Sequence, residues 1–265
     1  MTHVKTPSDL RVRAIAGIAM IAGALGALLA GGGALWLLMV VIALFMMAEW
    51  SDLHGIDPKA KRLGQYILSV PLAIMAPIAA GSDPFSLGLL VGAAFFAVIV
   101  TRRRALAIGT LYCGLPVFAL VLIRDQPHGI VLTLWTLALV WATDIGAYFA
   151  GRTIGGPKLA PVISPNKTWA GLIGGVAFAG LFGAVMHVRY GLPLRLALAT
   201  PLLAVLAQGG DLYESWLKRR AGVKDSGNIL PGHGGLMDRL DGLVPVAPIA
   251  ALLVMWPSLV QALGA

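Results

Sequence analysis

The chain is poor in charged residues and has almost no cysteine. Only 12% of its 265 residues are charged, roughly half the share of an ordinary soluble domain, whereas 58% are hydrophobic and the mean hydropathy is +0.85. This balance excludes a typical soluble enzyme. The single cysteine, Cys113, lies inside an apolar run. A disulfide within the chain and a cysteine-based metal centre are therefore excluded, and Cys113 is interpreted as a small buried hydrophobe.

The apolar residues gather in long runs separated by short polar breaks. A bilayer core needs about 20 apolar residues per helix, so the pattern predicts an all-α, polytopic integral membrane protein with about nine transmembrane helices in a single domain. The predicted spans cover residues 14–30, 34–50, 66–81, 85–101, 105–123, 129–149, 169–187, 194–217 and 242–262. The first run follows a basic stretch, as in a signal peptide. An uncleaved span is favoured because a second apolar run follows almost at once.

The basic residues fall almost entirely on alternate connections between the predicted spans. Those assigned to the cytoplasmic side are Lys5, Arg11, Arg13, Lys59, Lys61, Arg62, Arg102, Arg103, Arg104, Arg152, Lys158, Lys167, Lys218, Arg219, Arg220, Lys224 and Arg239. Only Arg124, Arg189 and Arg195 fall on the other side. The positive-inside rule then predicts a cytoplasmic N-terminus and an outside C-terminus. The same rule accounts for the net charge of +8 without a nucleic-acid partner.

Two connections on the predicted cytoplasmic side are long, basic and rich in glycine and proline. They cover residues 151–168 and 218–241. Long loops in a compact protein are usually functional or disordered, and these two lie on one face, as a shared active site requires. Glycines within span 169–187 are interpreted differently, because small residues at helical spacing let membrane helices approach closely.

Acidic side chains lie near the cytoplasmic ends of the predicted spans. Asp144, Asp211 and Glu214 are of this kind, and a carboxylate in a membrane span is costly enough to suggest a function. Asp211 and Glu214 are three residues apart and share a helix face, and Asp238 and Asp241 repeat this spacing. Carboxylate oxygens suit Mg²⁺ bound together with substrate phosphates. Zn²⁺ is disfavoured because His and Cys ligands are lacking.

The segment between these two acidic pairs has the composition of a phosphate-binding loop. Its lysines and arginines can neutralise phosphates, and Gly232, Gly234 and Gly235 let backbone N–H groups approach anionic oxygens. The other long connection contains Ser164 and Thr168 just before a span. These residues fit an anion site at a helix N-terminus or an ordinary helix cap, and the sequence leaves both open.

Several motifs in the C-terminal half carry a specific resemblance. They are Asp144-Ile-Gly-Ala-Tyr148-Phe-Ala-Gly151-Arg152, Ser164-Pro-Asn-Lys167-Thr-Trp169, Gly210-Asp211-Leu-Tyr-Glu214, Ser215-Trp-Leu-Lys218-Arg219, Lys224-Asp225-Ser226-Gly227 and Pro231-Gly-His233-Gly-Gly235-Leu-Met-Asp238-Arg239-Leu-Asp241. Together they resemble the signature of the phosphatidate cytidylyltransferase (CDP-diglyceride synthetase) family. Residues from about 126 to 265 carry the match, and about 1–125 resemble the family only as generic spans. Ala170 stands where the family usually has an acidic residue, which questions the need for that side chain.

The resemblance implies attack of a phosphatidate oxygen on the α-phosphorus of CTP, with release of pyrophosphate. It implies Asp211 and Asp238 as the principal Mg²⁺ ligands, and Asp241, Asp144 and Asp225 as further metal or ribose contacts. Phosphate-binding cations implied in the same way are Lys167, Lys218, Arg219, Lys224 and Arg239. Further substrate contacts are expected from Ser164, Asn166, Thr168, His233, Gly234 and Gly235, with His233 donating to a phosphate or orienting the loop.

The expected partners are CTP and phosphatidic acid, and the expected location is a bacterial inner membrane with the active site facing the cytoplasm. A homodimer and a monovalent cation beside Mg²⁺ stay open. A related CTP-using transferase or kinase with an isoprenoid acceptor is an alternative, because acyl and isoprenoid chains are equally apolar. A membrane transporter is an alternative of another class, but it leaves the glycine-rich basic loop unexplained.

Overall fold

The computed structural model describes residue 17 and residues 21–229 and 234–264. The long helices are α2 (Gly32–Leu53), α3 (Pro58–Ile74), α4 (Pro84–Thr101), α5 (Arg104–Arg124), α6 (Gly129–Thr153), α7 (Trp169–Tyr190), α8 (Leu194–Arg220) and α10 (Leu243–Gly264). The short helix α9 (Met237–Leu240) precedes α10, and two short strands, β1 (Lys158–Ala160) and β2 (Ser164–Thr168), lie between α6 and α7.

Seven of these helices are long and apolar enough to cross a bilayer: α2, α4, α5, α6, α7, α8 and α10. The prediction of a mainly helical, polytopic membrane protein is confirmed at this level. Helix α3 has 17 residues, and a shorter apolar helix covers Ile21–Ala30. The number of nine spans therefore stays a prediction, and most of residues 14–20 in the first predicted span lie outside the described part of the chain.

Most predicted boundaries agree with the structure to within a few residues, but the span at 66–81 was placed wrongly. The helix covers Pro58–Ile74 instead, and Asp57 caps its start by accepting a hydrogen bond from the N–H of Ala60. A proline at the first helical position supports the same start. The helix ends before Pro77, since proline disfavours helical backbone at the residue that precedes it.

The all-α prediction is wrong for the connection between α6 and α7, which folds into an antiparallel hairpin of β1 and β2. Lys158 pairs with Thr168, and Ala160 pairs with Ser164. The strands have three and five residues and lack the alternation of apolar and polar residues by which a strand is recognised. Their sequence therefore resembles that of a loop.

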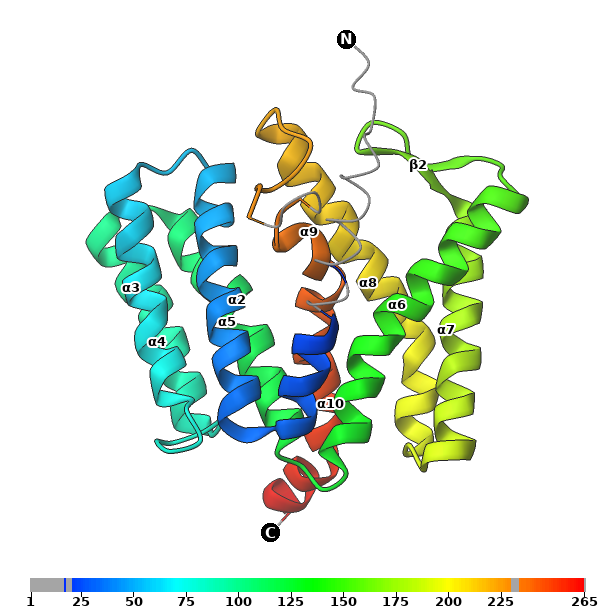
Figure 1. Ribbon diagram of the computed structural model, residues 1–265, viewed down its shortest axis with the longest axis horizontal. Coiled ribbons are helices and arrows are strands. Elements are labelled where there is room, and N and C mark those ends of the chain that lie inside the picture. Colours follow the sequence, from blue (N-terminus) through cyan, green and yellow to red (C-terminus); the bar gives the residue numbers. More distant parts are fainter. Residues whose placement is uncertain (1–16, 18–20, 230–233, 265) are drawn as a thin grey trace.

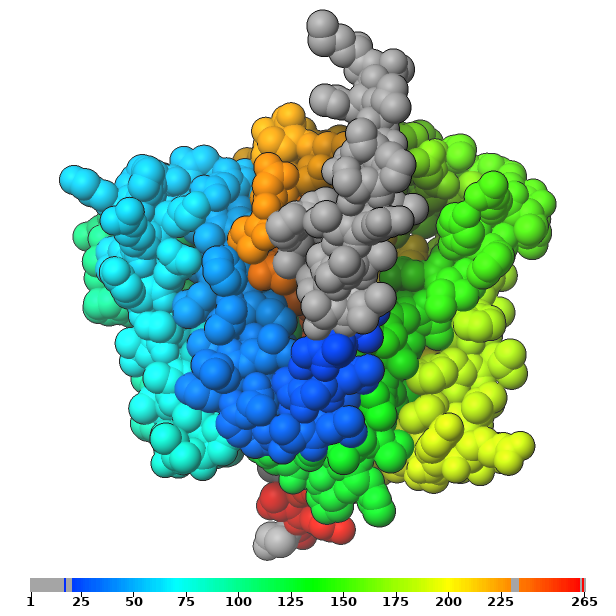
Figure 2. All heavy atoms as spheres, viewed as in Figure 1, coloured from blue at the N-terminus to red at the C-terminus, as the bar shows by residue number. Residues whose placement is uncertain are grey.

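Helices α9 and α10 and the upper half of α8 lie between two groups, with α2 to α5 on one side and α6 and α7 on the other; α8 crosses α6 and its lower half lies beside α7 (Figure 1). Helix α5 is the most buried of the seven candidate spans. The hairpin and the segment that follows α8 project at the same end of the molecule (Figures 1 and 2). This end carries both long connections predicted from the sequence.

Helices α6 and α7 pack closely through glycine. A Cβ atom at Gly174 would lie 2.1 Å from the Cβ of Ala150, and one at Gly175 would lie 2.8 Å from the carbonyl oxygen of Thr143. No side chain fits at these two positions without moving the neighbouring helix, which confirms the packing role expected for glycine in this span. The close packing holds the hairpin, which joins these two helices, in a defined place.

Candidate active site

A cavity of about 630 Å³ opens between α6, β2, α7 and α8. Among the residues that line it are the predicted site residues Asp144, Asn166, Lys167, Thr168 and Asp211. These residues come from three separate motifs of the sequence. The fold thus brings the 164–169 motif together with the acidic residues of α6 and α8.

A chain of polar contacts links the residues of this cavity. Lys167 Nζ lies 2.5 Å from Asp211 Oδ2 and donates to Gln208 Oε1 at 2.9 Å. Gln208 Nε2 in turn donates to Asp144 Oδ1 at 3.3 Å, and Ser215 Oγ donates to Asp211 Oδ1 at 3.3 Å. Strand β2 is thereby tied to both α6 and α8.

Gln208 was missed by the sequence analysis, although it is only 5% exposed and joins two predicted site residues. A signal was available, because Gln208 precedes Asp211 by three residues and so shares its helix face. Polar side chains inside a membrane span usually find a partner on another helix. Here the partners are on α6 and β2.

Thr168 lines the cavity, whereas Ser164 is not among the described residues that line it. Thr168 is the N-cap of α7, and its Oγ1 accepts a hydrogen bond from the N–H of Gly171 at 3.0 Å. The ordinary cap that the sequence left open is therefore present, and it leaves the Thr168 hydroxyl proton available to an acceptor. Ser164 begins β2 and is absent from the residues that line the cavity in the described part of the chain.

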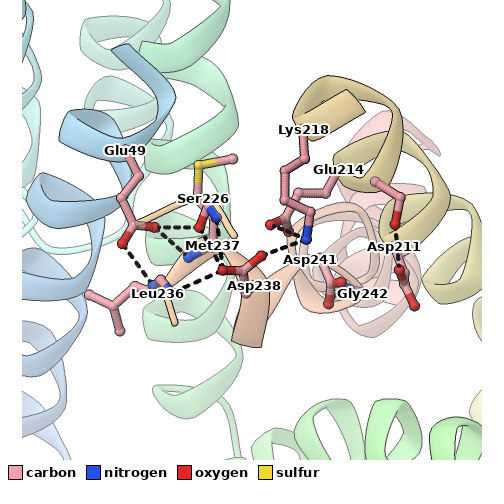
Figure 3. Close-up of polar contacts among 12 residues, drawn as sticks. Glu49, Asp211, Glu214, Lys218, Ser226, Leu236, Met237, Asp238, Asp241 and Gly242 are labelled. Atoms are coloured by element: carbon pink, nitrogen blue, oxygen red, sulfur yellow. Dashed lines mark hydrogen bonds and ion pairs between the residues drawn. The ribbon is translucent and has the colours of Figure 1, made fainter. Parts of the chain in front are cut away.

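A second group of contacts surrounds Asp238 on α9 (Figure 3). Its Oδ2 accepts hydrogen bonds from the N–H groups of Ser226 and Gly235, both at 2.9 Å, and from Ser226 Oγ at 3.1 Å. Its Oδ1 accepts from Lys218 Nζ at 2.5 Å. Burial opposes the charged form, but Lys218 and the two N–H groups outweigh it and hold the pKa of Asp238 below its usual range.

Two further carboxyl groups near Asp238 are incompletely compensated. Glu214 is fully buried, and neither of its oxygens has a hydrogen-bond partner among the described residues; Lys218 Nζ lies 3.4 Å from Oε1. Burial, reinforced by the nearby Asp211, raises the pKa of Asp241 to about 7. Burial of a carboxyl group with few partners disfavours its charged form.

The two proposed principal metal ligands each bind a lysine in the structure. Asp211 pairs with Lys167 and Asp238 with Lys218, and Asp241 lies between Asp211 and Asp238 in the view of Figure 3. Among the described residues, no three acidic, His or Cys side chains are already arranged to hold a metal ion. The carboxylates of Asp211, Asp238 and Asp241 offer oxygen ligands of the hard type that Mg²⁺ prefers.

Glu49 on α2 is a residue that the sequence analysis overlooked. It is 2% exposed, and its carboxylate accepts hydrogen bonds from Ser226 Oγ at 3.0 Å and from the N–H groups of Leu236 and Met237, both at 2.9 Å (Figure 3). Only three acidic residues were counted inside predicted spans, yet Glu49 lies in span 34–50. An acidic residue in an apolar run was itself the signal.

The other predicted residues lie around these two groups. Arg219 Nε donates to the carbonyl oxygen of Ile163 at 3.4 Å, which links the end of α8 to the hairpin. Lys224, Asp225 and Arg239 are exposed. A Cβ at Gly234 would lie 3.1 Å from Asp238 Oδ2. His233 lies outside the described residues.

Comparison with known proteins identifies the family. A profile described as the cytidylyltransferase family matches residues 11–256. The chain belongs to this family. The phosphatidate cytidylyltransferase of Brucella suis is 40% identical over 256 residues, covering 92% of this chain and 93% of the relative. That of Staphylococcus haemolyticus is 33% identical over 267 residues, covering 93% and 99%.

The family assignment confirms the resemblance that the C-terminal motifs carry and extends it to the N-terminal helices. A third relative, the phosphatidate cytidylyltransferase of Rickettsia bellii, is 30% identical over 254 residues and covers 92% of this chain. Membership in the family favours the enzyme over the transporter.

Proposed function

We propose that the chain is a phosphatidate cytidylyltransferase, which converts CTP and phosphatidate into CDP-diacylglycerol and pyrophosphate in phospholipid synthesis. The observation that carries this proposal is the similarity to phosphatidate cytidylyltransferases along nearly the whole chain. The geometry supports it, because lysines and carboxylates from β2, α8 and α9 gather at the end of the molecule that carries both long connections.

In the proposed reaction, a phosphate oxygen of phosphatidate attacks the α-phosphorus of CTP. One bond forms between this oxygen and the α-phosphorus, the bond from the α-phosphorus to the bridging oxygen of the β-phosphate breaks, and pyrophosphate leaves with the electron pair. Such a transfer depends on in-line positioning and on neutralisation of charge. Lys167 and Lys218 are each fixed by a carboxylate, so both ammonium groups are held ready to bind phosphate oxygens.

The remaining predicted residues complete the proposed binding site. Arg219, Lys224 and Arg239 neutralise the phosphates, and Asp144 and Asp225 contact the ribose or a metal ion. Further hydrogen bonds to the substrates come from Ser164, Asn166, Thr168, His233 and Gly234, while Gly235 acts at the site through Asp238. The backbone N–H of Gly235 donates to Asp238 in the structure, so its part is to orient this carboxylate beside the substrate.

Mg²⁺ fits the acidic residues of this site. Asp211, Asp238 and Asp241 would hold it, and the buried Glu214, whose Oε1 lies 3.4 Å from Lys218 Nζ, adds a further acidic group to this region. When bound, the ion supplies neutralisation of the triphosphate charge.

We further propose that the active site faces the cytoplasm of a bacterial inner membrane, with the N-terminus inside and about nine spans. The connection after α4, the hairpin and the segment after α8 carry basic residues and lie toward one end of the molecule in Figure 1, as does the start of α3 with its lysines and arginine. The connections after α3, α5 and α7 lie toward the other end. This arrangement agrees with the positive-inside rule.

The proposal is tested with the purified protein in detergent, with labelled CTP and each of three acceptors: phosphatidate, a prenol and an ether-linked isoprenoid phosphatidate analogue. We expect labelled CDP-diacylglycerol and pyrophosphate with phosphatidate, loss of turnover when EDTA removes Mg²⁺, and recovery when Mg²⁺ is returned. If the protein prefers an isoprenoid acceptor, that lipid and not phosphatidate is its substrate. Absence of nucleotide turnover with all three acceptors would refute the function.

A further inference from the structure

Glu49 joins the N-terminal helices to the segment that holds Asp238. Three groups donate to its carboxylate, namely Ser226 Oγ and the N–H groups of Leu236 and Met237. Met237 lies 188 residues away along the chain, so the contact is purely tertiary. Glu49 is 2% exposed, and a buried carboxylate persists when hydrogen-bond donors replace the water that it has lost.

Ser226 connects Glu49 to Asp238. Its Oγ lies 3.0 Å from Glu49 Oε2 and 3.1 Å from Asp238 Oδ2, and its N–H donates to the same Asp238 oxygen. A hydroxyl has one proton to donate, so it serves one carboxylate at a time. The backbone N–H keeps Ser226 on Asp238 when the hydroxyl proton turns to Glu49.

Glycine lets this segment lie against Glu49. A Cβ at Gly227 would lie 2.5 Å from Glu49 Oε1, and a Cβ at Gly235 would lie 2.7 Å from Glu49 Oε2 and 2.0 Å from Ser226 Oγ. The close approach therefore requires glycine at both positions. These two glycines of the family motif bring the backbone toward a carboxylate of the protein itself.

The consequence of these contacts is a fixed orientation of Asp238. Its Oδ2 is held by Ser226 and Gly235, which are the residues that Glu49 contacts or lies against. Its Oδ1 is left facing Lys218, the lysine that also lies 3.4 Å from Glu214. A change at Glu49 thus reaches Asp238 through two neighbours, without direct contact.

We propose that Glu49 is a positioning residue of the reaction, which holds residues 226 and 235–237 so that Asp238 presents Oδ1 to the metal ion and to Lys218. The inference rests on the proposed function for its catalytic consequence. Its structural part, the restraint of the 226 and 235–237 backbone, stands on the geometry alone.

The test compares Glu49→Gln, Glu49→Ala and Ser226→Ala with Ser51→Ala as matched control. Ser51 is buried two residues further along α2, and its Oγ donates only to the carbonyl oxygen of Met47 in the same helix among the contacts of the described residues. Two readouts are measured: hydrogen–deuterium exchange of the amides of residues 226 and 235–237, and kcat/KM together with the Mg²⁺ concentration for half-maximal activity.

We expect Glu49→Ala to speed exchange of these amides and to lower kcat/KM by about 100-fold. Glu49→Gln should lower kcat/KM by about 10-fold. Losses of about 10- to 100-fold are the range found when groups that orient metal ligands are removed. The half-saturating Mg²⁺ concentration should rise in both variants. Ser51→Ala should match the wild type. Because Glu49 and Ser226 act in one network, the effects of Glu49→Gln and Ser226→Ala should be non-additive in the double variant.

The inference is overturned if Glu49→Gln, folded as judged by its thermal transition, keeps both wild-type exchange and wild-type Mg²⁺ dependence. If Glu49→Ala fails to fold, its loss of folding marks only a structural role, and Glu49→Gln decides the inference by the same criterion. If the wild type makes no CDP-diacylglycerol, the proposed function fails, and the exchange measurement still decides whether Glu49 restrains the segment.

Discussion

Lys167 on strand β2 and Asp211 on helix α8 form an ion pair with 2.5 Å between Nζ and Oδ2. The pair closes one side of the cavity between α6, β2, α7 and α8. The packing of α6 against α7 fixes the backbone of the hairpin, but a lysine side chain has a flexible four-carbon stem. The ion pair therefore gives the proposed phosphate-binding ammonium group a defined position.

Lys167→Met should lower kcat/KM by about 100-fold, the scale of losing one group that stabilises charge in the transition state. The change also leaves Asp211 without its cation. Steady-state kinetics with CTP and phosphatidate measure the effect. The matched control is Lys158→Met, on the exposed face of β1 in the same hairpin, which should keep its activity. Equal losses in the two variants would contradict the specific role of Lys167.

Asp211→Asn and Asp238→Asn should each abolish turnover while the protein still folds and inserts. The amide conserves the shape of the carboxylate but weakens Mg²⁺ binding. Formation of CDP-diacylglycerol and the thermal transition in detergent measure the two properties. Asp52→Asn, at an exposed ion pair with Lys61, should behave as the wild type. Near-normal product formation by either site variant would remove that residue from the metal site.

Gln208→Leu should lower kcat about 10-fold, because its amide orients both Lys167 and Asp144 and the loss of such an orienting group typically costs this much. Gln208→Glu should be worse, since it places a third carboxylate beside Asp144 and Asp211. Kinetics at saturating CTP report the change. In the control Gln126→Leu, the lost amide contacts the carbonyl oxygen of Leu122 in the last turn of the preceding helix α5, and kcat should not change.

Gly174→Ala should destabilise the protein by about 1–3 kcal/mol, the usual cost of overpacking. Its new Cβ would lie 2.1 Å from the Cβ of Ala150, so α6 and α7 would have to separate. Equilibrium unfolding in mixed micelles measures the free energy of unfolding. Gly92→Ala on α4 adds the same methyl group where no atom lies within 4 Å and should be neutral or slightly stabilising. A neutral Gly174→Ala would show that the helices adjust freely.

Asp57→Ala should lower the thermal transition temperature at pH 7, and the difference from the wild type should shrink in acid. The N–H of Ala60 donates to Asp57 and, with the nearby Arg103, holds the pKa of Asp57 below its usual value. A lowered pKa contributes stability above the pKa of the unfolded state, about 4, that is lost as the pH falls through the folded pKa. A difference that stays constant from pH 7 to pH 3 would exclude a contribution from the charge.

The membrane-spanning helices could be predicted well from the sequence because hydropathy over about 20 residues is a strong signal. The bounds of α4, α5 and α8 follow directly from their apolar runs. Helix α3 was misplaced because its first five residues include Lys59, Lys61 and Arg62, which reduce the hydropathy. The Asp57-Pro58 pair marked its start, but a capping motif is a weaker signal for a helix boundary than hydropathy averaged over about 20 residues.

The candidate site was predictable where motifs are local and was missed where partners are distant. Spacing along a helix places Asp211 and Glu214 on one face, and it would also have placed Gln208 there. It does not reveal which helix faces them. Glu49 and Ser226 are 177 residues apart, and their contact depends on how α2 packs beside α9, which the pattern of apolar residues leaves undetermined.

The contact between α2 and the segment before α9 has a consequence for chimeric proteins. The N-terminal helices are not an interchangeable membrane anchor, since one of them supplies the acceptor for two backbone amides and a serine of the motif region. A chimera that takes residues 1–125 from a distant relative must therefore bring an acidic side chain to the position of Glu49 in α2. Without it, the transplanted helices would insert and pack, but residues 226 and 235–237 would lose their acceptor and Asp238 would no longer be held in a fixed orientation.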